Sequence, residues 1–202
     1  MNIRFATLLS VVLVTFLLVA CSTTPKASFY TLNEADSVVP PDRQSRLVLA
    51  IGPIDIPQYL DRPQIVTRAG GNRLSVDEFN RWGGRLDEEI SRVLAQNIGR
   101  SLGTRNIFNY PSRIAPDADY RIGLDIRGFD GALGGEVTLD VAWSLIADRS
   151  GKVMETGQTL YRSLSGGEGY DAYAAALSET LEQLGNDLAA ALHRLEPQKR
   201  AR

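Results

Sequence analysis

The sequence predicts an α/β fold of the α+β type, in which a mainly antiparallel sheet packs against two long helices in a single domain. Residues 120–127 and 137–145 alternate apolar and polar side chains, as strands of a half-buried sheet do. Leucine and isoleucine recur at helical spacing over 86–98 and again over 177–195. The length of 202 residues fits one domain, and the formal net charge of −2 argues against a protein built mainly to bind nucleic acid.

The first twenty residues have the composition of a bacterial export signal. Fifteen of them are hydrophobic, and Arg4 supplies a positive start. As a helix, the apolar run 5–20 would be about 24 Å long, which is shorter than the roughly 30 Å hydrocarbon core of a bilayer. A cleaved signal peptide is therefore favoured over a membrane-spanning anchor.

The end of this signal resembles the lipobox of bacterial lipoproteins. Its residues are Leu18-Val19-Ala20-Cys21, so cleavage after Ala20 makes Cys21 the first residue of the mature chain. Diacylglycerol on its sulfur and an acyl chain on its amine then give durable membrane attachment. The alternative is an ordinary cysteine after a conventional signal. Ser22, in place of an aspartate, favours the periplasmic face of the outer membrane over retention at the inner membrane.

We divide the chain into a signal peptide (1–20), a lipidated tether (21–46), a folded domain (47–196) and a disordered tail (197–202). The tether is rich in Ser, Thr, Pro and charge, and a flexible chain of this length extends about 25–30 Å on average. Within it, the segment 28–32 is β-prone and is a candidate to dock on the domain as a strand.

The folded domain begins with β structure. A dense apolar run with β-branched residues predicts a buried strand over 47–56. Two prolines then frame an irregular stretch, 57–63. The segments 64–68 and 73–76 flank Gly-Gly-Asn, which predicts a hairpin.

A helical period follows the hairpin. It begins near Asp77, and Ser75 and Glu78 have the spacing of a capping box. The glycine pair at 83–84 weakens a helix that starts so early. Gly103 is a plausible stop signal.

The second half of the chain gives the clearest pattern. A short strand is expected over 107–110, and the strands 120–127, 137–145 and 152–164, joined by short links, predict an antiparallel meander. The last helix is predicted over 170–195, where the leucine spacing favours a core helix over a coiled-coil contact.

Motifs for catalysis, metal binding and cofactors are scarce. One cysteine excludes an intrachain disulfide and a CxxC motif, and the only histidine, His193, makes a histidine-based metal site improbable. The chain has neither a GxxxxGK[ST] loop nor a GxSxG elbow. We therefore predict a protein that is not an enzyme, with no catalytic residue, no metal and no cofactor beyond the acyl groups on Cys21.

Four large side chains stand out in irregular polar surroundings. Tyr59, Leu60 and Arg62 lie between two prolines, and Trp82 precedes the glycine pair. Aromatic and arginine side chains in loops often anchor protein interfaces, so these four are candidate partner-binding residues. The alternative is local packing, in which Trp82 covers the base of a helix and Arg62 pairs with a nearby carboxylate.

The same residues resemble a known family. The stretch 52–66, Gly-Pro-Ile-Asp-Ile-Pro-Gln-Tyr-Leu-Asp-Arg-Pro-Gln-Ile-Val, is similar to the signature of the ABC-type transport auxiliary lipoproteins. Further matches are Phe-Tyr-Thr-Leu at 29–32, Arg-Trp at 81–82 and the helix 170–192. The glycines at 83–84 depart from the family pattern.

The resemblance implies a role in lipid traffic across the bacterial envelope. Family members act with MCE-domain proteins, an inner-membrane permease and, in many systems, an ABC ATPase. The resemblance therefore implies an outer-membrane lipoprotein that docks the MCE partner, with a homo-oligomeric ring as one arrangement. It also implies that no covalent bond is made or broken by this chain.

Two other functions remain open from the residues alone. One is a structural or assembly lipoprotein of another envelope export machine. The other is a carboxylate-dependent envelope enzyme, which requires two carboxylates that converge in a cleft.

Overall fold

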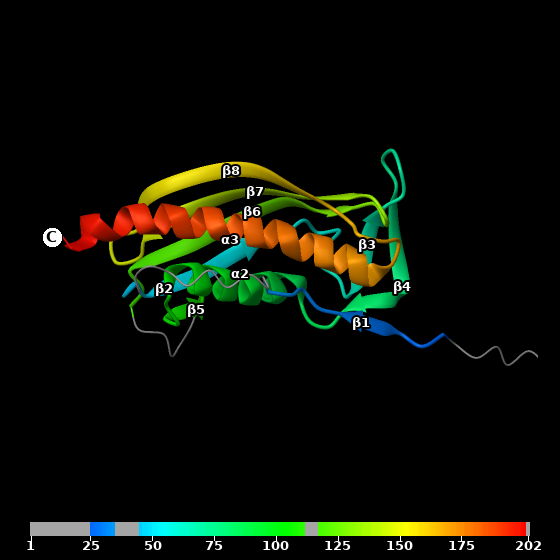
Figure 1. Cartoon of the computed structure of the whole chain (residues 1–202), viewed down its shortest axis with the longest axis horizontal. Coiled ribbons are helices and arrows are strands. Elements are labelled where there is room, and N and C mark those ends of the chain that lie inside the picture. The colour runs from blue at the N-terminus through cyan, green and yellow to red at the C-terminus, as the bar shows by residue number, and fades with distance from the viewer. Residues whose placement is uncertain (1–24, 35–44, 112–116, 201–202) are drawn as a thin grey trace, which may run out of the picture.

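The computed structural model describes residues 25–34, 45–111 and 117–200. The predicted signal peptide, its cleavage site and Cys21 lie outside these ranges. Figure 1 shows an elongated molecule in which the helix α3 runs along most of its length. The prediction of a single α/β domain with two helices is confirmed, and the strands form two sheets.

The larger sheet contains the predicted meander. It has five strands in the order β5-β2-β6-β7-β8, and β6, β7 and β8 pair antiparallel in succession. The strand β2 adds parallel to β6, and β5 adds parallel to β2, so the sheet is mixed. The bounds are β2 Leu49–Asp55, β5 Ile107–Asn109, β6 Tyr120–Gly131, β7 Glu136–Ala147 and β8 Lys152–Leu164.

The smaller sheet has the order β1-β4-β3. The predicted hairpin is present, because β3 (Gln64–Arg68) and β4 (Leu74–Trp82) pair antiparallel. Gly70 and Gly71 both adopt positive φ in the turn between them, a conformation that favours glycine. The β-prone segment of the predicted tether does dock, since β1 (Ser28–Tyr30) pairs parallel with the end of β4.

The first helix starts later than the sequence predicts. Helix α2 spans Leu86–Leu102, and the residues expected to open it near Asp77 continue the strand β4 instead. Two features explain the difference. The Asp77 carboxylate accepts the backbone N–H groups of Phe79 and Asn80 within a bulged part of the strand. The residues from Asn80 to Trp82 then pair with β1, so their backbone belongs to a sheet.

The ends of the two helices follow from local signals. Gly103 closes α2 in the left-handed conformation with φ 65°, as predicted. Helix α3 spans Tyr170–Arg200 and includes four residues of the stretch that the sequence assigns to a tail. Its periodic leucines are all buried: Leu177, Leu181, Leu184, Leu188 and Leu195.

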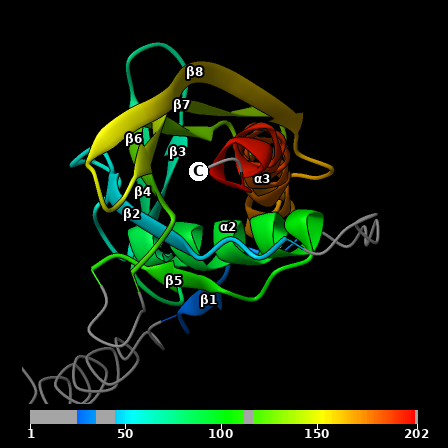
Figure 2. The ribbon, with the colours of Figure 1, turned by 90° about the vertical axis from the view of Figure 1, so that its left-hand side faces the viewer.

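The core lies between the larger sheet and the two helices. Figure 2, viewed along the long axis, shows the sheet curving over α3 with α2 beneath it. The apolar positions of β6 and β7 face this core, in agreement with their alternation. Among the described residues, neither helix combines the length and the apolar character needed to cross a bilayer.

Candidate functional site

The four residues singled out from the sequence occupy different environments. Leu60 and Trp82 are only 3% and 6% exposed and belong to the core. Tyr59 is half-buried, and Arg62 is exposed. The burial of Leu60 and Trp82 agrees with the alternative interpretation, in which these side chains pack locally. Arg62 is the member of the set that faces solvent.

Backbone hydrogen bonds set this inward and outward arrangement. The Leu60 N–H donates to the Pro57 carbonyl at 2.9 Å, and the Arg62 N–H donates to the Leu60 carbonyl at 2.8 Å. These bonds form a tight turn between the prolines at 57 and 63. The Trp82 N–H donates to the Pro63 carbonyl at 2.8 Å, which joins the turn to the end of β4. We call residues 57–63 the signature turn.

A buried ion pair lies behind the signature turn. The carboxylate of Asp130, at the end of β6, is only 5% exposed. Arg68 of β3 donates to both of its oxygens, from Nε to Oδ1 at 2.7 Å and from Nη2 to Oδ2 at 2.9 Å. The Tyr59 hydroxyl donates to Oδ2 at 2.5 Å. The Arg68 guanidinium also lies 5.7 Å from the centre of the Tyr59 ring, within reach of a cation–π interaction.

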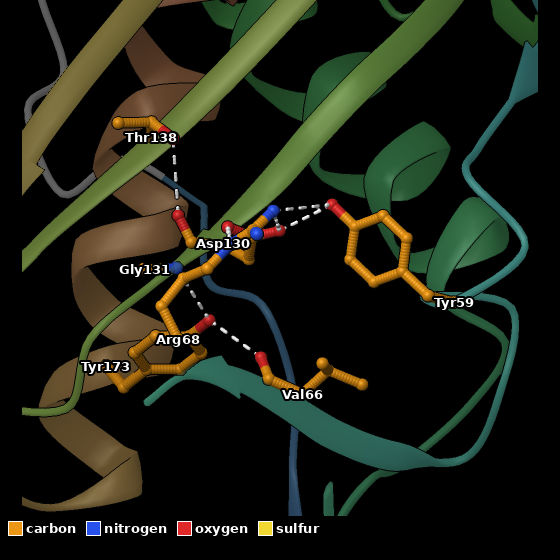
Figure 3. A network of polar contacts seen from close by, with 7 residues as sticks. All are labelled: Tyr59, Val66, Arg68, Asp130, Gly131, Thr138 and Tyr173. Carbon is orange, nitrogen blue, oxygen red and sulfur yellow. Dashed lines mark hydrogen bonds and ion pairs between the residues drawn. The ribbon is translucent and has the colours of Figure 1, made fainter. Parts of the chain in front are cut away.

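Helix α3 joins the same network through Tyr173. Its hydroxyl donates to the Val66 carbonyl at 2.9 Å and accepts the Gly131 N–H at 3.2 Å. The Thr138 hydroxyl of β7 donates to the Asp130 carbonyl at 3.3 Å. Figure 3 shows that these contacts converge from the hairpin, the larger sheet, α3 and the signature turn. We call this set the clamp: Tyr59, Val66, Arg68, Asp130, Gly131, Thr138 and Tyr173.

The contacts of the clamp hold the signature turn and the hairpin in one conformation against β6. The Asp130 carboxylate accepts three charge-assisted or short hydrogen bonds, and a bidentate arginine is the strongest partner available to it. Burial, with the Asp130 carboxylate adding to it, raises the pKa of Tyr59 to about 12. Burial also raises the pKa of Tyr173 above its ordinary value. Both phenols therefore stay neutral and remain donors at physiological pH.

We expect Tyr59→Phe to cost about 1–3 kcal/mol of unfolding free energy at pH 7, since it removes a hydrogen bond to a carboxylate. The difference from the wild type should shrink above pH 10. The folded-state pKa of Tyr59 is raised, so the unfolded chain loses this proton first and the wild type loses stability as pH rises from 10 towards 12. Urea unfolding at pH 7, 9 and 11 measures both effects, and a constant difference would show that the phenol is not linked to folding.

The residues left a carboxylate-dependent enzyme open, and one pocket can be compared with what it requires. A pocket of about 540 Å³ lies at the carboxyl end of α2, and its lining contains one carboxylate, that of Glu34. Arg100, also in the lining, forms an ion pair with it. Within the described ranges, no three His, Cys, Asp or Glu side chains gather closely enough to hold a metal ion. His193 is exposed on α3.

Comparisons with known proteins place this geometry in context. The family described as "ABC-type transport auxiliary lipoprotein component" matches residues 30–189, a range that includes the signature turn and the clamp. A search of curated proteins finds no match.

Two solved structures share the fold. One is a crystal structure of a DUF330 protein from Xanthomonas campestris, with 17% identity and a TM-score of 0.68, covering 87% of this chain and 100% of that one. The other is a crystal structure of an uncharacterized protein, with 18% identity and a TM-score of 0.66, covering 83% and 99%. At these identities the likeness concerns the fold alone.

Proposed function

The chain belongs to the family of ABC-type transport auxiliary lipoproteins, and from this premise we propose that it is an accessory protein of an MCE-type lipid transport system between the inner and outer membranes. The carrying observation is the family match, which spans almost the whole described fold. In this proposal the chain supports envelope integrity by docking an MCE-domain partner that acts with a permease and ABC components. It binds and positions, and it catalyses no reaction.

The proposal assigns the membrane attachment to Cys21. Diacylglycerol and an N-acyl chain on this residue anchor the protein on the periplasmic face of the outer membrane, and Ser22 directs it there. The lipobox pattern and the family description support this assignment.

The proposal assigns the partner contact to the signature turn. Arg62 and the exposed edge of Tyr59 make the contact, while Leu60 and Trp82 hold the turn in place from the core. The support is geometric: the clamp fixes Tyr59 through Asp130, so a short loop is presented in one conformation. A preformed loop loses little conformational entropy when it binds. A homo-oligomeric ring would repeat this turn around a central axis.

A pull-down with the full-length chain tests the partner assignment. Purified MCE-domain protein should retain the wild type, and Arg62→Glu should weaken the interaction at least tenfold. The matched control is Arg149→Glu, which reverses the charge of a different exposed arginine, located in the turn between β7 and β8. Absence of binding by the wild type to every MCE protein of the same bacterium would remove the proposal and favour an assembly role in another export machine.

We expect Cys21→Ala to release the protein from the membrane fraction into the soluble fraction, because the acyl chains are the proposed source of its attachment. Cells that carry only this variant should show the same barrier defect to detergents as cells without the gene. Fractionation and a detergent-sensitivity assay measure the two effects. Ser22→Asp is the matched variant, since it keeps the anchor but should move the protein to the inner membrane.

A further inference from the structure

The domain binds a part of the chain that lies close to the predicted anchor. In β1, Ser28, Phe29 and Tyr30 pair with Asn80, Arg81 and Trp82 of β4. The Tyr30 hydroxyl donates to the Asn80 side chain at 2.8 Å, and its ring lies 5.8 Å from that of Tyr170.

The residues just after β1 are also held in place. Leu32 is only 1% exposed, and the Asn33 N–H donates to the Ser178 hydroxyl at 3.0 Å. The chain is therefore fixed to the domain over residues 28–33.

This docking shortens the link between the domain and the membrane. Six residues separate Cys21 from Ser28. Seven Cα–Cα steps extend to about 25 Å at most, and a flexible chain of that length averages about 15 Å. The first strand of the domain must then stay within about 25 Å of an acylated Cys21, although a tether through residue 46 would have reached much further.

Four of the exposed large apolar residues belong to strands that meet at this end of the molecule. Phe29 on β1 is 67% exposed, and Phe79 and Val76 on β4 are 39% and 38% exposed. Leu164, 74% exposed, ends β8 beside the loop that leads to Tyr170, and Tyr170 hydrogen-bonds Asp77 of β4. Large apolar side chains grouped on a surface mark a contact with a membrane or a partner. We call these four residues the apolar end: Phe29, Val76, Phe79 and Leu164.

Basic side chains accompany the apolar end. Lys26 precedes β1 and Arg73 lies in the hairpin turn, and both are exposed. Arg81 lies beside Phe29 in the strand register, so the two side chains share one face of the smaller sheet. There Arg81 also forms a solvent-exposed ion pair with Glu78 at 3.5 Å. Aromatic side chains flanked by cations suit the headgroup region of a bilayer that contains anionic lipid.

We infer that the apolar end rests on the bilayer to which Cys21 attaches the protein, with Phe29 and Phe79 in the headgroup region. The inference depends on the proposed lipid anchor. The short link between Cys21 and Ser28 favours a bilayer as the surface that covers the apolar end. A domain anchored by such a link meets the lipid surface at a high effective concentration. Figure 1 shows β1, β3 and β4 at one end of the long axis, so the turn between β7 and β8 would point away from the membrane.

Depth-dependent quenching on vesicles tests the inference. The acylated mature chain is reconstituted into phosphatidylethanolamine vesicles with phosphatidylglycerol and a nitroxide lipid. The variant Phe79→Cys carries an environment-sensitive fluorophore, since the acylated Cys21 has no free thiol. Val153→Cys is the matched control, because Val153 is an exposed apolar residue (53%) at the other end of β8. We expect quenching at position 79 to be at least threefold stronger than at position 153.

Two further measurements separate the inference from the proposed anchor. Mass spectrometry and vesicle flotation of the same protein report acylation and attachment. Equal quenching at both positions in an acylated, floating protein overturns the inference and leaves the anchor intact. A chain that is neither acylated nor attached overturns both. Hydrogen exchange on the unlabelled chain gives a second test, since exchange in residues 74–82 should slow when vesicles are present and an unchanged rate would contradict the inference.

Discussion

Replacing Trp82 by alanine is expected to lower the free energy of unfolding by about 3–5 kcal/mol, the usual cost of removing a large aromatic side chain from a core. Trp82 is 6% exposed and ends β4, where its N–H is bonded to the Pro63 carbonyl. Loss of the ring leaves a cavity under the signature turn. Urea unfolding of the purified chain measures the change.

The control for Trp82 lies on the same strand. Phe79→Ala removes an aromatic side chain that is 39% exposed, so it should cost less than about 1 kcal/mol. The comparison also separates packing from partner contact. If Trp82→Ala kept its full stability but lost binding to an MCE protein, Trp82 would be a contact residue and the packing role would be wrong.

Replacing Arg68 by alanine is the second change with a large expected effect, about 3 kcal/mol or more. The substitution leaves the Asp130 carboxylate buried without its cation, because that side chain is 5% exposed. The Arg68 side chain is 42% exposed. Asp130→Ala therefore leaves a guanidinium that water can solvate. We therefore expect Arg68→Ala to be the more destabilising of the two.

A double-mutant cycle checks this explanation. Arg68→Ala with Asp130→Ala should cost less than the sum of the two single changes, because the uncompensated buried charge is gone. Arg162→Ala is the matched control: its pair with Glu136 is 55% and 46% exposed, so the change should stay below about 1 kcal/mol. Additive single effects at Arg68 and Asp130 would contradict the clamp.

The local pattern of apolar and polar residues predicted the antiparallel meander of the larger sheet, but it placed the start of α2 too early. In β6 and β7 the alternation of apolar and polar residues predicts which side chains face the core, and the apolar side chains are the buried ones. The segment around Asp77 has a helical period and a capping-box spacing, yet it forms a strand. Its pairing partner is β1, about fifty residues earlier in the chain, and a local pattern carries no information about such a partner.

The candidate site was predicted in part. The signature turn was located from its composition, but the clamp that fixes it was not, because Arg68 and Asp130 lie 62 positions apart. A bulge in β6 between Ile126 and Gly128 shifts the register, so that Phe129 pairs with Leu139 and Asp130 with Thr138. Phe129 therefore lies in the core and Asp130 faces the hairpin. Without the bulge, the alternation of β6 would have placed the Asp130 side chain in the apolar core. The sequence pattern therefore gave no reason to expect an ion pair between Asp130 and Arg68.

The pairing of β1 with β4 has a mechanical consequence for a protein held by its N-terminus. Force applied at Cys21 would reach β1 first, which is a strand of three residues. Behind it are the buried side chain of Leu32 and the hydrogen bond from Arg92 to the Leu32 carbonyl. Detaching these contacts leaves the five-stranded sheet and both helices paired, since β1 belongs to the smaller sheet.

Release of the described residues up to Glu34 would lengthen the link to Cys21 from about 25 Å to roughly 45 Å. The domain would thus move about 2 nm under tension before its core came under load.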